Sequence, residues 1–184
     1  MKTCLIILVL LISKSVWSQS DVARDSTAVN TSRLTIAIAG SAAVWAASYI
    51  ALDKAWYADQ PRSSFHVFND IKEWQQADKG GHIWSAYQMS RLTTEMWKWT
   101  GMKKNHAVWA GAASGIAYQS IIEIQDGFAP DWGFSWSDMA ANVVGASAFA
   151  SQELLWKEQR IQIKYSYHDA GHPAELHSRA DDLF

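Results

Sequence analysis

The sequence predicts an all-α protein with a bundle of four main helices, a short amphipathic helix and an isolated C-terminal strand. Three observations support this class. Four segments of roughly 20 residues are rich in alanine and large apolar residues, and glycine, proline or capping residues bound them. One segment, residues 160–168, alternates apolar and polar residues as a strand does. The length of 184 residues is enough for one domain with a sizeable core.

Residues 1–18 have the layout of a secretory signal peptide, with Lys2, an apolar run from Cys4 to Ile12, and small residues before a cleavage point after Ser18. The apolar run is too short to span a bilayer. Cys4 is the only cysteine, so the mature chain would hold no disulfide and no cysteine-based metal site. We therefore expect export to the bacterial cell envelope, where the protein would be periplasmic or membrane-associated.

The helical domain is predicted over residues 33–158, after a flexible polar linker at 19–32. The core of its first helix, residues 34–52, is uncharged. At roughly 1.5 Å per residue this core could nearly cross a bilayer, or it could pack against other helices. The third helix follows Asn105, a good N-cap, and Gly127 ends it. The four main helices are predicted over residues 33–56, 78–100, 106–127 and 138–157.

Two shorter elements are predicted outside these helices. After Pro61, Ser63 or Ser64 can cap a short amphipathic helix. Its apolar face would carry residues that recur every three positions, namely Phe65, Phe68, Ile71 and Trp74. The strand at 160–168 has no evident partner upstream, so residues 159–184 are interpreted as a strand and tail that begin a further segment.

The composition excludes some partners and favours others. Net charge is −2 and there is no basic run, so no nucleic-acid partner is expected. The chain holds 11 tryptophans, a residue that prefers the boundary between apolar and wet surroundings. The tryptophans therefore indicate either helices at a membrane interface or a tryptophan-rich helical core. A membrane lipid or another envelope component is the expected partner.

Polar side chains are predicted to converge at one end of the bundle. If neighbouring helices are antiparallel, the end of the third helix lies near the starts of the second and the fourth. Lys79 and Ser135 lie beside these helix ends. Each end carries a pair of polar residues at helical spacing: Asp78 and His82, Glu123 and Asp126, and Asp138 and Asn142.

Several of these residues also have a purely structural interpretation. Asp78 fits an N-cap, and Ser135 with Asp138 fits the spacing of a capping box. His82 could be a core histidine with one hydrogen bond. Asn142 lies one turn inside an alanine-rich helix, where a buried amide needs hydrogen-bond partners.

Glu123 and Asp126 require a nearby cation, because carboxylates at a helix C-terminus face the negative end of the helix dipole. Lys79 or a protonated His82 could supply it in a structural network of salt bridges and hydrogen bonds. A divalent metal held by His82, Glu123 and Asp138 is the alternative. The Glu-x-x-His motif typical of metal-binding bundles is absent.

Catalytic motifs are absent as well: the sequence holds no G-x-S-x-G elbow, P-loop, dinucleotide-binding glycine pattern or H-E-x-x-H. His82 with Asp78 and a water molecule could act as a general base. Glu123 and Asp138 would then serve as ligands or acids.

The segments FHVFNDIKEWQQADKGGHIWSAYQMS and SIIEIQDGFAPDWGFSWSDMAANVVGA carry a family resemblance. They share D-K-x-x-H at Asp78, Lys79 and His82, then Glu123 before a turn. The pattern ends with G-x-S-x-x-D-x-x-x-N-x-x-G, from Gly133 to Gly145. Over roughly residues 63–150 the chain resembles the YfiM-type predicted periplasmic lipoproteins and, more distantly, the VanZ-like family.

This resemblance implies a helical cell-envelope protein and no particular activity. The VanZ-like proteins are membrane proteins linked to glycopeptide resistance. The chain departs from the pattern in two places. It lacks a lipobox cysteine, and it has Asp126 where VanZ-like proteins have glutamine.

Three functions follow as hypotheses. The polar residues could form a structural or partner-binding network, a site for hydrolysis or group transfer on an envelope lipid or glycan, or part of a lipid-binding module. A structural network should be closed, with every charge paired. A catalytic site should open into a pocket with perturbed pKa values, and a lipid module should show an apolar groove or patch.

Overall fold

The computed structural model describes residues 28–58, 61–71 and 76–164, and this part of the chain contains helices and no strand. The predicted helical class is therefore confirmed for these residues. A short π-helical turn, η1 (Asp53–Tyr57), continues the first helix. The predicted signal peptide and most of the linker at 19–32 lie outside the described residues. The four α-helices are α2 (Thr31–Leu52), α3 (Ala77–Trp99), α4 (Lys104–Asp126) and α5 (Trp136–Leu155).

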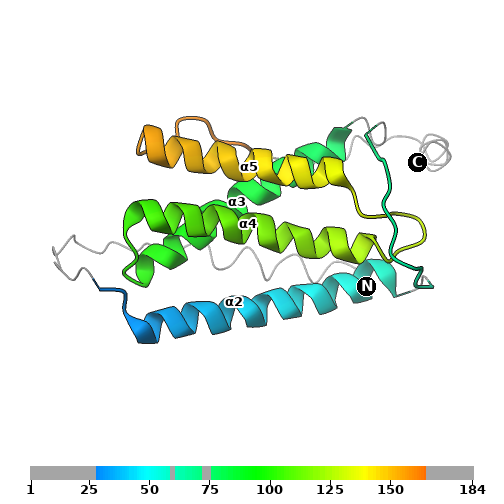
Figure 1. The fold of residues 1–184 in the computed structure, drawn as a ribbon, viewed down its shortest axis with the longest axis horizontal. Coiled ribbons are helices and arrows are strands. Elements are labelled where there is room, and N and C mark those ends of the chain that lie inside the picture. Colours follow the sequence, from blue (N-terminus) through cyan, green and yellow to red (C-terminus); the bar gives the residue numbers. More distant parts are fainter. Residues whose placement is uncertain (1–27, 59–60, 72–75, 165–184) are drawn as a thin grey trace, which may run out of the picture.

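Helices α3, α4 and α5 pack closely against one another, whereas α2 touches α3 and α4 at few positions. Figure 1 shows α2 lying alongside α4, and α5 on the opposite side of the molecule. The chain direction alternates, so the starts of α3 and α5 lie at the same end of the molecule as the ends of α2 and α4. This arrangement brings four helix termini together around the polar residues.

Small residues allow the close packing of α3 against its two neighbours. A Cβ atom added at Gly115 of α4 would lie 2.9 Å from the backbone oxygen of Ala86. A Cβ added at Gly145 of α5 would overlap the backbone oxygen of Ile83. Backbone atoms cannot move aside as a flexible side chain can, so both helices approach α3 more closely than any residue with a Cβ would permit.

We expect Gly145→Ala to lower the free energy of unfolding by about 1–3 kcal/mol, because the new methyl group overpacks the contact between α3 and α5. Denaturant unfolding in mild detergent would measure the change. Gly80→Ala is the control, since an added Cβ there meets nothing within 4 Å. That variant should gain up to about 1 kcal/mol from helix propensity. Equal loss in both variants would contradict the packing argument.

The apolar core lies between α3, α4 and α5 and is built mainly from small residues. The rings of Tyr87 and Phe149 meet edge to face with centroids 6.0 Å apart, and both side chains are fully buried. The other buried members of this cluster are Val108, Ala112, Ala146 and Ala150.

The prediction of an amphipathic helix after Pro61 is wrong over residues 63–71, where the structure contains no helix. Val67 forms an isolated parallel bridge with Phe134, where Phe68 N donates to Phe134 O at 3.0 Å. Phe65 packs edge to face on Phe128, with centroids 5.3 Å apart. Backbone hydrogen bonds and ring contacts with the loop before α5 thus hold this segment in place of the bonds of a helix, while Phe65 and Phe68 stay partly exposed. Residues 72–75 lie outside the described residues.

The strand predicted at 160–168 does not form over residues 160–164. Side chains satisfy the backbone there: Ile161 N donates to Gln152 Oε1 at 2.7 Å, and Ile161 O accepts from Gln152 Nε2 at 3.0 Å. Tyr87 OH donates to the same carbonyl oxygen at 3.2 Å. With these partners the segment needs no neighbouring strand. The remainder of the predicted strand and the tail lie outside the described residues.

The helix ends follow the predicted caps only in part. Ser135 is the N-cap of α5, and its Oγ accepts from Asp138 N at 3.1 Å. Helix α4 begins earlier than predicted, and Lys103 rather than Asn105 stands at its N-cap. Asp78 lies in the first turn of α3, whose N-cap is Gln76 in a left-handed conformation. The Asp78 side chain is therefore available for contacts other than capping.

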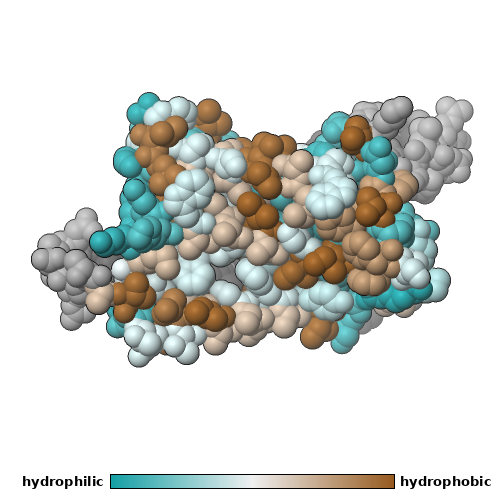
Figure 2. Space-filling view, in the orientation of Figure 1, coloured by the Kyte–Doolittle hydropathy of each residue, from teal (hydrophilic) through white to brown (hydrophobic). Residues whose placement is uncertain are grey.

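Helix α2 presents apolar side chains to the outside. Among the residues that the structure describes, one helix is long and apolar enough to cross a membrane, judged by length and composition. This helix is Thr31–Ala55. Figure 2 shows brown and pale atoms, with little teal, along α2 between its two ends. Its exposed large apolar residues include Ile36, Ile38, Val44 and Ile50.

Candidate functional site

The predicted convergence of polar residues is observed at the end of the molecule where α3 and α5 begin and α4 ends. We call the residues that meet there the polar cluster. It contains all the residues singled out in the sequence and one acid from the loop before α3: Asp70, Asp78, Lys79, His82, Glu123, Asp126, Ser135, Asp138 and Asn142.

One side of the cluster is closed around Lys79, whose side chain is only 10% exposed. Its Nζ lies 2.5 Å from Asp70 Oδ2, 3.0 Å from Asp138 Oδ1 and 3.3 Å from Asp78 Oδ2. Ser135 and Ser137 add hydrogen bonds from their hydroxyls to Asp70 Oδ1, at 2.8 and 2.5 Å. This side ties the loop at Asp70 to the first turns of α3 and α5.

The pKa values on this side reflect strong pairing. Burial favours the neutral form of Asp70, but hydrogen bonds from Asp138, Lys79, Ser137 and Ser135 hold its pKa well below the usual range. Burial likewise opposes the charge of Lys79, and its hydrogen bonds to Asp70 and Asp138 raise its pKa above the usual value. Asp70 and Lys79 are therefore a charged pair at neutral pH.

Asp138 differs from Asp70 although both contact Lys79. Burial and the hydrogen bond with Asp70 raise the pKa of Asp138 to about 6, against the lowering effects of His82 and Lys79. Its buried Oδ1 makes no aligned hydrogen bond within the described residues, although Lys79 Nζ is only 3.0 Å away. The ion pair with Lys79 stabilises this oxygen nonetheless, because Coulomb attraction does not depend on the donor angle.

The other side of the cluster is built around His82. Its Nδ1 lies 3.1 Å from Oδ1 of Asn142, which is fully buried on α5. Gln119 of α4 points its Nε2 at the same oxygen, 3.5 Å away. An amide oxygen only accepts, so Nδ1 carries a proton, and a ring with a single proton has its lone pair at Nε2. This Nε2 lies 3.4 Å from Glu123 Oε1 and 3.7 Å from Asp78 Oδ1.

Glu123 is the most deeply buried acid of the cluster, with a side chain 1% exposed. Burial raises its pKa to about 8, and the nearby Asp138, Asp126 and Asp78 add to the rise, whereas the hydrogen bond from Ser135 N opposes it. That bond, 3.1 Å long, is made by Oε2. Oε1 accepts no hydrogen bond within the described residues. Glu123 therefore keeps its proton at neutral pH.

Asp126 stands at the edge of the cluster, where it accepts a hydrogen bond from Tyr57 OH of η1. Burial raises the pKa of Asp126, and it also raises that of Tyr57 well above the usual range. This contact joins the end of α2 to the end of α4. Arg62 stacks over the Tyr57 ring, with its guanidinium carbon 5.8 Å from the ring centroid.

The His82 side opens into a cavity of about 530 Å³, which we call the cluster cavity. Its polar lining, which we call the polar wall, includes Asp70, Asp78, His82, Gln119, Asp126 and Asp138. Its apolar wall comes from several elements, including Leu52 of α2, Phe68 of the loop, Ile122 of α4 and Trp132 before α5.

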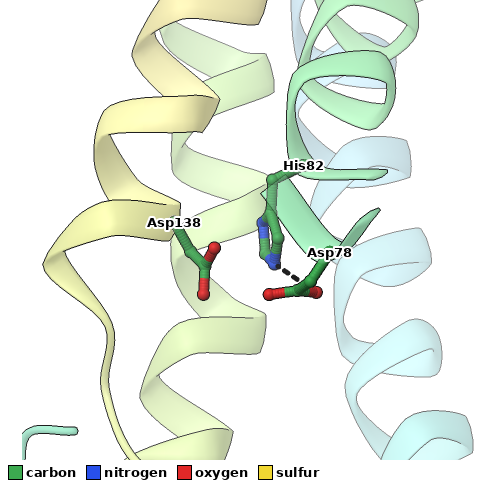
Figure 3. Close-up of side chains that lie close together, drawn as sticks. All are labelled: Asp78, His82 and Asp138. Carbon is green, nitrogen blue, oxygen red and sulfur yellow. Dashed lines mark ion pairs between the residues drawn. The ribbon is translucent and has the colours of Figure 1, made fainter. Parts of the chain in front are cut away.

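Figure 3 shows that Asp78, His82 and Asp138 point toward one another, the first two from α3 and the third from α5. One ligand atom of each lies within 4.8 Å of the others, a spacing compatible with a shared metal ion. The metal set predicted from sequence used Glu123 in place of Asp78. Glu123 contacts the same nitrogen of His82 from the buried side, and that set stays a prediction.

Sequence reasoning missed Asp70, Ser137 and Tyr57. Asp70 falls within the amphipathic helix predicted after Pro61, and nothing in that prediction places it beside Lys79. The nearest signal was its presence in the first of the segments that carry the family resemblance. Tyr57 gave no signal, because only the packing of α2 beside α4 brings it to Asp126.

Residues 67–153 match the model of a family described as predicted periplasmic lipoprotein (DUF2279). This range includes every member of the polar cluster. The chain matches no curated protein and no solved structure. The chain is exported to the bacterial cell envelope, and over residues 67–153 it is similar to the uncharacterised family of predicted periplasmic lipoproteins.

Proposed function

We propose that the protein is a membrane-associated envelope protein that binds an amphiphilic envelope component, a phospholipid or a polyprenyl-linked glycan, in the cluster cavity. The observation that carries this proposal is that both polar and apolar side chains line the cavity. His82 and Asp138 are among the polar ones, and Phe68 and Trp132 are among the apolar ones. A ligand with a polar head and an apolar tail would satisfy both walls, and the volume suits a small ligand or a lipid headgroup region.

A purely structural or partner-binding network accounts for only one side of the cluster. The Lys79 side meets the requirement of such a network, because its charges are paired. On the other side, His82 lines the cavity, and the acids Asp78 and Glu123 lie beside its Nε2. Buried polar groups that open into a cavity are typical of binding sites. We therefore assign structure to the Lys79 side and ligand binding to the His82 side.

Membrane association is supported by α2. At roughly 1.5 Å per residue, Thr31–Ala55 is longer than the bilayer core of about 30 Å. The only cysteine, Cys4, lies in the predicted signal peptide, so this helix rather than a lipidated cysteine would hold the mature chain at the membrane. Leu52 and Tyr57 at the end of α2 line the cavity, which would then lie beside the membrane surface. The resemblance to the VanZ-like membrane proteins agrees with this arrangement.

The test fills the cavity with a side chain. Gly81 lines the cavity, and a Cβ added there meets nothing within 4 Å, so Gly81→Leu places its side chain in that space. Native mass spectrometry of the mature chain in detergent would count bound molecules of short-chain phosphatidylethanolamine, phosphatidylglycerol and a polyprenyl diphosphate-linked sugar. We expect one bound molecule in the wild type and at least tenfold weaker binding in Gly81→Leu.

Gly80→Leu is the matched control, since Gly80 is the exposed neighbour in α3, has equal space for a Cβ and does not line the cavity. It should bind as the wild type does. Equal binding by Gly81→Leu, or the absence of binding by the wild type to all three probes, would refute the proposal.

A second candidate function is hydrolysis or group transfer on the same class of molecule. The orientation of His82 favours it, because the bond between Nδ1 and Asn142 leaves Nε2 as a base that faces the cavity beside Asp78. Glu123 and Asp138 would act as acids or ligands. Product analysis after incubation with the three probes tests it. Turnover should disappear in His82→Ala, and turnover that survives this substitution would exclude His82 as the base.

A further inference from the structure

We propose that Asp78, His82 and Asp138 bind a divalent first-row transition metal ion on the polar wall of the cluster cavity. The cation itself is inferred independently of any lipid. Only its role toward a ligand headgroup, described below, rests on the proposed function.

The geometry brings three ligand atoms together from two helices. The atoms lie within 4.8 Å of one another, and His82 Nε2 is 3.7 Å from Asp78 Oδ1. Two ligands of one tetrahedral ion, with bonds of about 2.0–2.1 Å, are roughly 3.4 Å apart. A small rotation of the half-exposed Asp78 side chain would close the difference. Figure 3 shows the three side chains, and Asp78, His82 and Asp138 all line the cavity. Three protein ligands beside a cavity match the layout of sites that keep a position open for a further ligand.

His82 is held in the orientation that a metal ligand needs. Its Nδ1 donates to Asn142 Oδ1 at 3.1 Å, which leaves the lone pair of Nε2 directed toward Asp78. Metal-binding histidines almost always donate their second nitrogen to such an oxygen. Asn142 is fully buried, and Gln119 Nε2, 3.5 Å away, points at the same oxygen. Asn142 is thus a positioning residue for His82.

A buried oxygen without a donor supplies the independent observation. Glu123 Oε1, on a side chain 1% exposed, has no hydrogen-bond partner within the described residues and lies 3.4 Å from His82 Nε2. Asp138 Oδ1 is also buried, but Lys79 Nζ, 3.0 Å away, is its cation. A buried acid oxygen requires a proton or a cation nearby, so Glu123 Oε1 needs either its own proton or a bound ion. An ion bound at His82 Nε2 would lie close to both residues.

Lys79 does not take up the whole set of oxygens. Its Nζ contacts Asp78 Oδ2 and Asp138 Oδ1, so Asp78 Oδ1 remains for an ion on the cavity side, and Asp138 would bind that ion in addition to its contacts with Lys79 and Asp70. Imidazole with carboxylates suits Zn²⁺, Mn²⁺ or Co²⁺ better than Ca²⁺, which prefers oxygen ligands alone.

The ion would also resolve a conflict in the charge of the cavity. The acids on its polar wall would repel the phosphate of an envelope lipid. A metal ion with an open position could bind that phosphate directly. This step deepens the proposed function by naming phosphate-bearing lipids as the ligand class.

The experiment uses the full mature chain in detergent after dialysis against EDTA. Calorimetric titration with Zn²⁺ or Co²⁺ alone is expected to show one ion per chain. Bound Co²⁺ should give the visible absorption of a low-coordinate site. Asn142→Ala removes the positioning residue of His82 and should weaken binding of the ion roughly 10- to 100-fold. His82→Gln and Asp78→Asn each remove a ligand and should weaken binding at least as much. His82→Gln should also change the Co²⁺ spectrum.

Glu95→Gln is the control, because Glu95 is an exposed acid of the same helix that pairs with Lys98 at 2.6 Å. It should bind the ion as the wild type does. Asp78 is 42% exposed, so Asp78→Asn tests the site without a risk to folding, and circular dichroism would verify that it folds. The absence of one-to-one binding in the wild type, or equal binding by both ligand variants, would overturn the inference.

The lipid titration, repeated with and without EDTA, separates the two proposals. Ion binding without any lipid binding would retain the metal site and reject the proposed function. Lipid binding that EDTA does not weaken, in a chain that binds no ion, would retain the function and reject the metal.

Discussion

Replacement of Lys79 by methionine is expected to lower the free energy of unfolding by about 3–5 kcal/mol at pH 7, the cost of leaving a buried charge without its partner. The ammonium lies within 3.3 Å of Asp78, Asp70 and Asp138, and its side chain is 10% exposed. Methionine fills a similar volume but brings no charge. The loss therefore reports the electrostatic contribution rather than a cavity. Urea unfolding in mild detergent, followed by circular dichroism, would measure it.

Lys98→Met is the matched control in the same helix. Lys98 pairs with the exposed Glu95 at i, i+3, an interaction that contributes only about 0.2–0.5 kcal/mol. A double variant, Asp70→Asn with Lys79→Met, should recover part of the loss, because it removes a charge that Lys79 neutralises. If Lys79→Met costs no more than Lys98→Met, Lys79 is not the neutralising charge of the closed side.

Glu123→Gln is expected to stabilise the protein above pH 8 and to have little effect near pH 5. Burial raises the pKa of Glu123 from 4.5 to about 8, so the folded protein holds this proton more tightly than the unfolded chain does. The stability contributed by Glu123 is therefore complete below pH 4.5 and is lost as the pH rises to 8. Above pH 8 the wild type carries the cost of a buried carboxylate, on the order of 3–5 kcal/mol.

Glutamine imitates the protonated acid, because its carbonyl can accept from Ser135 N and its amide can donate to His82 Nε2. Asp78, His82, Asp126 and Asp138 face Glu123 and are present in both proteins. The two proteins are compared at pH 5 and at pH 9, both times with EDTA. The difference in their free energies of unfolding therefore comes mainly from Glu123.

Glu153→Gln is a control for which the stability is expected to depend on pH in the opposite direction. Burial favours the neutral form of Glu153, but hydrogen bonds from Gln159 and Lys104 and the charge of Lys104 lower its pKa. The stability that Glu153 contributes is therefore present above its unfolded pKa of 4.5. It is lost as the pH falls through the lower pKa that Glu153 has in the folded protein. Glu153→Gln should lower stability at neutral pH. A Glu123→Gln variant with the same pH dependence as the wild type would show that Glu123 is not protonated in the folded state.

The helical segments could be predicted because their signals are local. The apolar stretches, the capping residue Ser135 and the glycine after Asp126 define the start of α5 and the end of α4 within a few residues. The convergence of Asp78, His82, Glu123, Asp138 and Asn142 followed from the alternating direction of neighbouring helices. These predictions depend on spacing along the chain and on short connections, which the sequence contains.

The failed predictions depend on contacts between distant segments. The segment from Ser63 to Ile71 shows a helical spacing of apolar residues, but its partners are Phe128 and Phe134, which lie about 60 residues away along the chain. The non-helical path of this segment places Asp70 against Lys79 and Ser135. Residues 160–164 bond to the side chains of Tyr87 and Gln152 rather than to a strand.

The sequence by itself determined the helical class, the export to the envelope and the residue types of the polar cluster, because composition and periodicity carry these properties. Only the tertiary structure decided which oxygen faces Lys79 and which faces His82, how deeply Glu123 is buried, and that one side opens into a cavity. Burial and distances of a few ångströms set charge and pKa. Those quantities depend on how α3, α4, α5 and the loop at Asp70 pack together.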